Sequence, residues 1–185
     1  MDANREYDQG TFRNPIAGKA YKEYQGFIEK AKKSIKKGNG LIFDIHGQTH
    51  KEGWVELGYL VSTWRLNKDV PLAKYSSIKS LAERSSSTFK SILRGRKSLG
   101  YFLQKQLIKT IPSPAHLRPG KGGYFNGGYN IKRHGSLRGG NIDGIQIEIP
   151  RRYRNKDTAQ SFTISLAKAI HMFALENNYY QVCPL

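Results

Sequence analysis

The chain contains a single cysteine and few acidic residues, and each shortage limits what the protein can be. Cys183 cannot form an internal disulfide, so the 185-residue chain has no disulfide framework. Only 14 Asp and Glu oppose 31 Lys and Arg, and the formal charge of +17 favours anionic partners such as nucleic acid or small acidic substrates. The cations are spread along the whole chain without a nucleic-acid motif, so we favour a solvated basic surface over a dedicated nucleic-acid face.

Long hydrophobic runs are also missing. No run approaches the ~20 apolar residues that a membrane span needs. The polar, acidic start MDANREYDQG lacks the basic and apolar regions of a signal peptide, so no secretory address is predicted. With 38% hydrophobic residues the chain is long enough to close one core, and we expect one globular α/β domain over residues 1–185.

Hydrophobic periodicity predicts the main elements. Residues 17–37 have apolar side chains at three- and four-residue spacing, which indicates an amphipathic helix that ends at the glycines of KKGNG. The short run LIFDI then indicates a buried strand, and DGIQIEIP alternates with the period of two of another strand. Asp157 and Thr158 can cap a final helix. The weaker helical patterns between residues 61 and 109 are interrupted by serines, and we interpret this region as a helical insertion.

A long glycine- and proline-rich segment, IPSPAHLRPGKGGYFNGGY, is typical of a surface loop with a functional role. The two predicted strands and two long helices favour a mixed, mostly parallel sheet with helices on both sides. LIFDI and IQIEI are expected to be neighbouring inner strands of this sheet.

His46 is the first candidate for chemistry. It stands where LIFDI ends, and ligands gather at the carboxyl ends of strands in open α/β sheets. Imidazole is a common zinc ligand, although a histidine that is simply hydrogen-bonded in a strand-end turn is an alternative. His50 is four residues further on, but glycines on both sides argue against a helical two-histidine clamp, so we place it behind the site or on the surface.

Glu148 is the second candidate. Its side chain points away from those of Ile147 and Ile149, toward either solvent or a cleft. Beside a metal-bound water such a carboxylate can act as general base, whereas in solvent it is an ordinary strand residue. Arginines are candidates to clamp a substrate carboxylate by paired hydrogen bonds, namely Arg5, Arg133, Arg151 and Arg152.

Four stretches in this order resemble the N-formylglutamate amidohydrolase-like family, which has a zinc carboxypeptidase-like fold. They are DANRE, LIFDIHGQTHKEGWVELGY, GGYNIKRHG and IDGIQIEIPRRYR. The resemblance implies a zinc-dependent hydrolase of an amide, acyl-amino acid or peptide C–N bond next to a carboxylate. Its substrate would be a small acidic molecule such as an N-acyl amino acid or a peptide C-terminus.

The resemblance also implies roles for individual residues. Asn4 and Arg5 correspond to the pair that binds the substrate carboxylate and polarises the scissile carbonyl, and His46 corresponds to a zinc ligand. Glu148 corresponds to the catalytic glutamate, while Tyr129 and Arg133 are candidate substrate contacts.

One departure from the family pattern concerns the metal. The family's other two zinc ligands precede the Asn-Arg pair, and three residues before Asn4 leave no room for them. We therefore expect a C-terminal portion of the family domain or a shortened homologue, which binds zinc weakly because a catalytic zinc needs three protein ligands. A non-catalytic module that binds acidic ligands or nucleic acid through its basic surface is the alternative.

Overall fold

The computed structural model of the protein describes residues 14–35 and 38–180, which form an α/β fold around a four-stranded mixed sheet. The strands are β1 (Gly40–Gln48), β2 (Val55–Gly58), β3 (Thr110–Ile111) and β4 (Ile142–Pro150), in the order β1-β4-β2-β3. β1 runs parallel to β4, β4 antiparallel to β2, and β2 parallel to β3. The expected mixed sheet flanked by helices is therefore confirmed.

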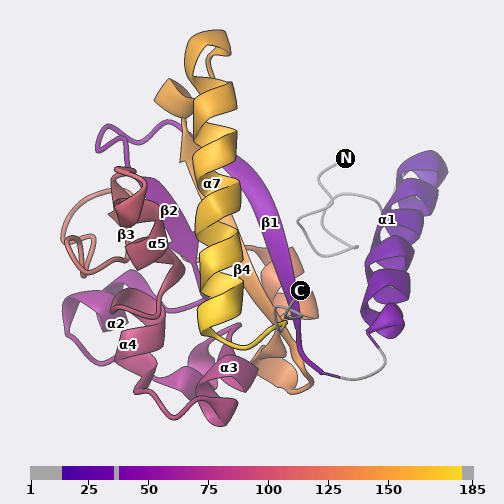
Figure 1. Ribbon diagram of the computed structural model, residues 1–185. Coiled ribbons are helices and arrows are strands. Elements are labelled where there is room, and N and C mark those ends of the chain that lie inside the picture. The colour runs from indigo at the N-terminus through magenta and orange to yellow at the C-terminus, as the bar shows by residue number, and fades with distance from the viewer. Residues whose placement is uncertain (1–13, 36–37, 181–185) are drawn as a thin grey trace, which may run out of the picture.

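The two longest helices lie on different sides of the molecule. α7 (Lys156–Glu176) runs along the sheet, with α5 (Leu99–Lys105) beside it, whereas α1 (Pro15–Ser34) stands apart from the sheet (Figure 1). α6 (Tyr129–His134) packs on the sheet face opposite α7 and connects α1 to the body.

The short helices are α2 (Thr63–Asn67), α3 (Lys79–Arg84) and α4 (Phe89–Arg94), with the 3-10 turns η2 (Ala73–Tyr75), η3 (Ser136–Arg138) and η4 (Arg151–Tyr153). Three of the hydroxyl residues that interrupt the helical pattern between residues 61 and 109 are helix N-caps. Ser62, Thr88 and Ser98 accept hydrogen bonds from the backbone N–H of Arg65, Ser91 and Tyr101, which begins α2, α4 and α5.

Strand alternation places apolar side chains on the face under α7. Ile145 and Ile147 of β4 and Leu57 of β2 are fully buried, in one core with Phe162 and Phe173 of α7. On the opposite face, a side chain added at Gly144 would meet Ile131 of α6. The even-numbered residues of β4 therefore face α6 rather than the apolar core.

Two expectations about the elements need correction. β1 and β4 are neighbours as predicted, but β1 is an edge strand of the sheet formed by the described residues, and Ile45 is 52% exposed rather than covered. The final helix begins after Asn155, so Asp157 lies inside its first turn instead of capping it. There a carboxylate is favourable because it faces the positive end of the helix dipole.

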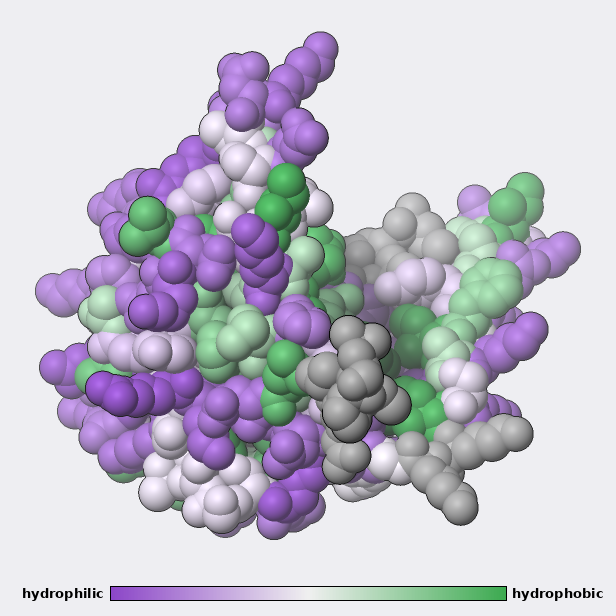
Figure 2. Space-filling view, in the orientation of Figure 1, coloured by the Kyte–Doolittle hydropathy of each residue, from purple (hydrophilic) through white to green (hydrophobic). Residues whose placement is uncertain are grey.

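The surface is mostly hydrophilic. Figure 2 shows charged and polar residues over most of one face, while exposed apolar side chains such as Ile16 and Phe27 lie on α1. Among the described helices, none is both long and apolar enough to cross a membrane.

Candidate functional site: a polar row across three strands

The sheet register brings three ionisable side chains into one row. His46 of β1 is paired with Glu148 of β4, and Glu148 is paired on its other side with Glu56 of β2. Directly paired residues of neighbouring strands project from the same face of a sheet. His46, Glu148 and Glu56 therefore share the face opposite α7, close to the carboxyl ends of the two parallel strands.

Two histidine–carboxylate pairs flank Glu148. The Nε2 atom of His46 lies 3.1 Å from Oδ1 of Asp44, which precedes it by two residues on β1. The Nδ1 atom of His50 lies 2.7 Å from Oε1 of Glu56. Both histidine side chains are 29% exposed, so the row is open to solvent at its imidazoles and closed at its carboxylates.

Glu148 occupies the middle of the row and is only 5% exposed. The interpretation of Glu148 as a solvent-facing strand residue is therefore wrong. Gln146 donates from Nε2 to its Oε1 at 3.1 Å. Burial raises the pKa of Glu148, and the nearby charges of Glu56 and Asp44 raise it further, while those of His46 and His50 lower it.

Glu56 is fully buried and makes hydrogen bonds with both of its oxygens. Oε1 is bonded to His50, and Oε2 accepts the backbone N–H of Phe125 at 2.7 Å. Burial raises the pKa of Glu56, and the hydrogen bonds from Phe125 and His50 oppose that shift. Glu56 thus connects the sheet to the glycine-rich loop.

That loop covers the end of β2. The ring of Phe125 lies 4.7 Å from that of His50, and the hydroxyl of Tyr124 donates to the carbonyl of Leu57 at 2.8 Å. A Cβ atom at Gly123 would come within 2.4 Å of the His50 ring, so only glycine allows this approach. The loop is therefore fitted against the site.

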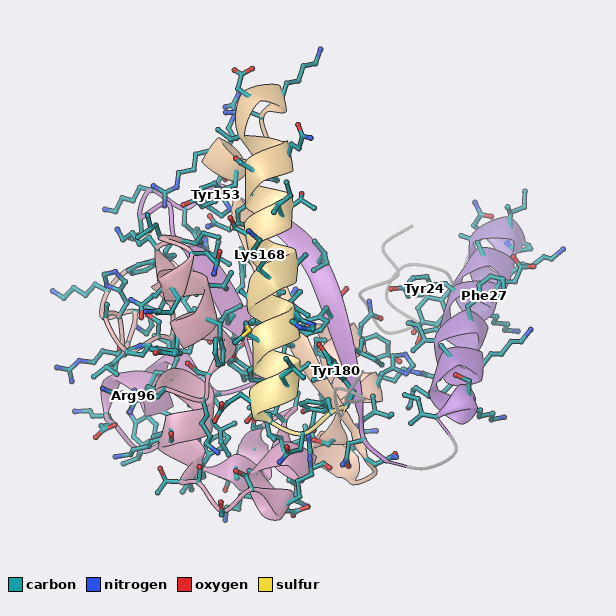
Figure 3. The ribbon with its side chains drawn as sticks, viewed as in Figure 1. Tyr24, Phe27, Arg96, Tyr153, Lys168 and Tyr180 are labelled. Atoms are coloured by element: carbon teal, nitrogen blue, oxygen red, sulfur yellow. The ribbon has the colours of Figure 1, made fainter. Side chains whose placement is uncertain are left out.

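Two buried side-chain oxygens on the same sheet face, beside the row, lack hydrogen-bond partners. Oδ2 of Asp44 and Oε1 of Gln146 have no hydrogen-bond partner among the described residues. Buried polar atoms are nearly always paired, so two unpaired acceptors on one sheet face point to a bound group or water at this place. The charge of Asp44 also acts on Tyr24 of α1. Burial raises the pKa of the Tyr24 hydroxyl, and the nearby negative charge of Asp44 raises it further. Figure 3 shows Tyr24 on the side of α1 nearest β1.

The candidate substrate contacts on α6 lie around a separate opening. Arg133 donates to the hydroxyl of Tyr129 at 2.8 Å, and this bond, more than any other effect, raises the pKa of Arg133. Both residues line a surface pocket of about 320 Å³ together with Glu29, Lys132 and Arg138. Asn130, the residue after Tyr129, is 3% exposed and donates to the hydroxyl of Tyr24 at 3.2 Å. α6 therefore lines this pocket with Tyr129 and Arg133 and, through Asn130, contacts Tyr24, on which the charge of Asp44 acts.

Two of the other predicted site residues, Asn4 and Arg5, lie outside the described residues. Arg151 and Arg152 are exposed on the 3-10 turn after β4, where Arg152 donates to the hydroxyl of Tyr153.

The family resemblance implies a zinc site at His46, which needs further His, Cys, Asp or Glu ligands nearby. Within residues 14–35 and 38–180, no group of three or more His, Cys, Asp or Glu side chains is arranged to hold a metal ion. A catalytic zinc needs three protein ligands, so the described residues alone do not fit a complete zinc site.

Asp44, Glu56 and Gln146 were not singled out from the sequence as site residues. Asp44 precedes His46 by two residues, as Gln146 precedes Glu148, and Glu56 lies between Val55 and Leu57. Scans against family models and searches of curated proteins and solved structures found no match at a significant level. The geometry defines an α/β domain with a row of partly exposed histidines and buried carboxylates on one face of its sheet.

Proposed function

We propose that the protein is a hydrolase that cleaves an amide or peptide C–N bond next to a carboxylate, with Glu148 as general base. The observation that carries this proposal is the position of Glu148, which is almost fully buried between two histidine–carboxylate pairs at the carboxyl ends of parallel strands. A carboxylate whose pKa is raised by burial binds a proton more readily, as general-base catalysis near neutral pH requires.

In the proposed step, Glu148 takes a proton from a water molecule while the water oxygen forms a bond to the substrate carbonyl carbon. The C–N bond then breaks, and the products are a carboxylic acid and an amine. Unpaired acceptors of Asp44 and Gln146 lie on the same face and are suited to orient the water or the substrate N–H.

The substrate is proposed to be a small acid, such as an N-acyl amino acid or a peptide C-terminus. Lys132 and Arg133 of α6 and Arg138 of η3 line the separate pocket together with Glu29, and the three cations can bind a carboxylate there. The net charge of +17 draws anions toward the protein. Asn4 and Arg5 stay candidates for the same task through the family resemblance.

The proposal includes a zinc carboxypeptidase-like fold for the chain, with His46 as one zinc ligand. Because the described residues lack a three-ligand group, the proposed step depends only on Glu148 and its neighbours. Zinc content is measurable directly. We expect well below one zinc per chain in the purified protein, and stoichiometric, tightly held zinc would contradict this part.

The test is hydrolysis of a panel of N-formyl and N-acetyl amino acids and short peptides, with and without added zinc. Glu148→Gln keeps the shape but removes the base, so kcat is expected to fall by at least ~100-fold. The matched control is Glu83→Gln, which changes an exposed glutamate of α3 and should leave the rate unchanged. A parent protein that hydrolyses no member of the panel, or an unaffected Glu148→Gln variant, would refute the proposal.

A second function, binding of an acidic ligand without turnover, is favoured by the pocket that Lys132 and Arg133 of α6 line together with Arg138 of η3. It predicts that an N-acyl amino acid binds the parent and the Glu148→Gln variant with equal affinity and is not hydrolysed by either. The Arg133→Ala variant should bind it more weakly. Affinity for RNA or DNA that falls steeply with salt and is insensitive to Arg133→Ala would instead indicate a basic nucleic-acid face.

A further inference from the structure

The His50–Glu56 pair resembles a positioned acid–base group more than a surface contact. An ionised carboxylate only accepts hydrogen bonds, so with Glu56 ionised the 2.7 Å contact between its Oε1 and Nδ1 of His50 places a proton on Nδ1. The second ring nitrogen, Nε2, is then available to exchange a proton on the other side of the ring.

The ring of His50 is fixed on several sides. Its backbone N–H donates to Oε1 of Gln48, whose Nε2 atom donates to the carbonyl of Trp54 at 2.8 Å. Phe125 covers the ring, and Gly123 approaches it too closely for any side chain. The bond to Gln48 holds the main chain of His50, while Glu56, Phe125 and Gly123 restrict the rotation of the imidazole, which is the requirement for proton transfer in a defined direction.

His50 is joined to Glu148 through Glu56, which is hydrogen-bonded to the His50 ring and pairs with Glu148 in the sheet register. The charges of both His46 and His50 act on the Glu148 carboxyl. His46 is paired with Asp44 on the edge strand, whereas the glycine-rich loop covers the ring of His50. His50 is therefore a candidate for a second proton-transfer group beside Glu148.

We infer that His50, oriented by Glu56, is the proton donor for the amine that leaves when the C–N bond breaks. This inference rests on the proposed hydrolase function. Glu148 accepts a proton from water as the new C–O bond forms, and the electron pair of the broken C–N bond takes a proton from Nε2 of the His50 imidazolium. Solvent reaches the partly exposed ring, so the proton held by Glu148 returns to His50 through water and both groups are restored.

The kinetic test compares two leaving groups on one acyl group: an alkyl amine, which needs protonation, and an activated phenol, which does not. His50→Gln is expected to lower kcat/KM by at least ~100-fold for the amide but by less than about tenfold for the ester. Glu148→Gln should lower both, and His171→Gln, on the outer side of α7, should lower neither. Equal losses for amide and ester in His50→Gln would overturn the donor role while leaving the hydrolase proposal intact.

A second measurement does not depend on turnover. Nitrogen-15 NMR of the parent is expected to show a slowly exchanging Nδ1–H on His50, and Glu56→Gln should lose it and reduce amide hydrolysis in parallel. A His50 ring protonated on Nε2 alone would overturn the positioning by Glu56. If the parent hydrolyses neither substrate, the donor role is refuted together with the proposed function, whatever tautomer the spectrum shows.

Discussion

The two faces of the sheet are made by the same strands but have opposite character. Toward α7, β4 presents Ile145 and Ile147, which are fully buried in the apolar core. Toward α6, the same strand presents Gln146 and Glu148, which are nearly as buried but are polar. Burial of an apolar side chain stabilises the fold, whereas burial of a carboxylate costs free energy unless it is compensated.

This difference separates the face that stabilises the fold from the face that carries the proposed chemistry. Burial of an ionisable group costs free energy, and perturbed groups of this kind cluster at functional sites. The concentration of carboxylates is notable because the chain has few of them. Three of its 14 acidic residues, Asp44, Glu56 and Glu148, share one face of the sheet.

The largest expected effect comes from breaking the apolar face. Ile147→Ala removes a fully buried side chain between the sheet and α7, and should lower the free energy of unfolding by about 2–5 kcal/mol. Urea unfolding followed by circular dichroism measures the loss. Ile164→Ala, at a 51% exposed position of α7, is the control and should cost less than about 1 kcal/mol. Equal losses in both variants would mean that the face under α7 is not the main core.

The sequence predicts some of the elements that form these two faces and not others. α1, α7, β1 and β4 have patterns long enough to be recognised, and the alternation in β4 correctly separated Ile147 from Glu148. β2 is only four residues long, so it was missed, and with it Glu56. Periodicity shows which residues share a face of one strand, but not which strand lies next to it. The row of His46, Glu148 and Glu56 depends on pairings between distant segments, which no local pattern encodes.

An intermediate effect is expected where the glycine-rich loop meets the polar face. Gly123→Ala places a methyl group against the His50 ring, and overpacking of this kind costs about 1–3 kcal/mol. The loop should lift from His50, which hydrogen exchange at the Phe125 amide would reveal as faster exchange. Gly26→Ala is the matched control, because a Cβ atom there meets nothing within 4 Å. In the middle of α1 this change should be neutral or stabilise the helix by up to about 1 kcal/mol. Unchanged exchange at Phe125 would contradict the close fit of the loop.

The smallest expected effect concerns the free energy that the fold loses by burying the ionised carboxylate of Glu148 on the polar face. Burial, with the charges of Glu56 and Asp44, raises the pKa of Glu148 above its value in the unfolded chain, which is about 4.3. The folded state therefore binds more protons than the unfolded state between these two pKa values. The contribution of Glu148 to stability is fully present below about pH 4.3, and it is lost as the pH rises through the raised folded-state pKa.

Glu148→Gln removes this titration and should make the protein more stable than the parent at neutral pH, because no buried carboxylate then has to ionise. The measurement is urea unfolding of both proteins from pH 4 to pH 8. The gap between them should widen with rising pH and become constant above the folded-state pKa, whereas Glu83→Gln should show no such gap. A gap that narrowed as the pH rose would show that the positive charges of His46 and His50 outweigh burial. Glu148 would then be an ion-pair partner with a low pKa and a poor general base, and the polar face would stabilise the fold as the apolar face does.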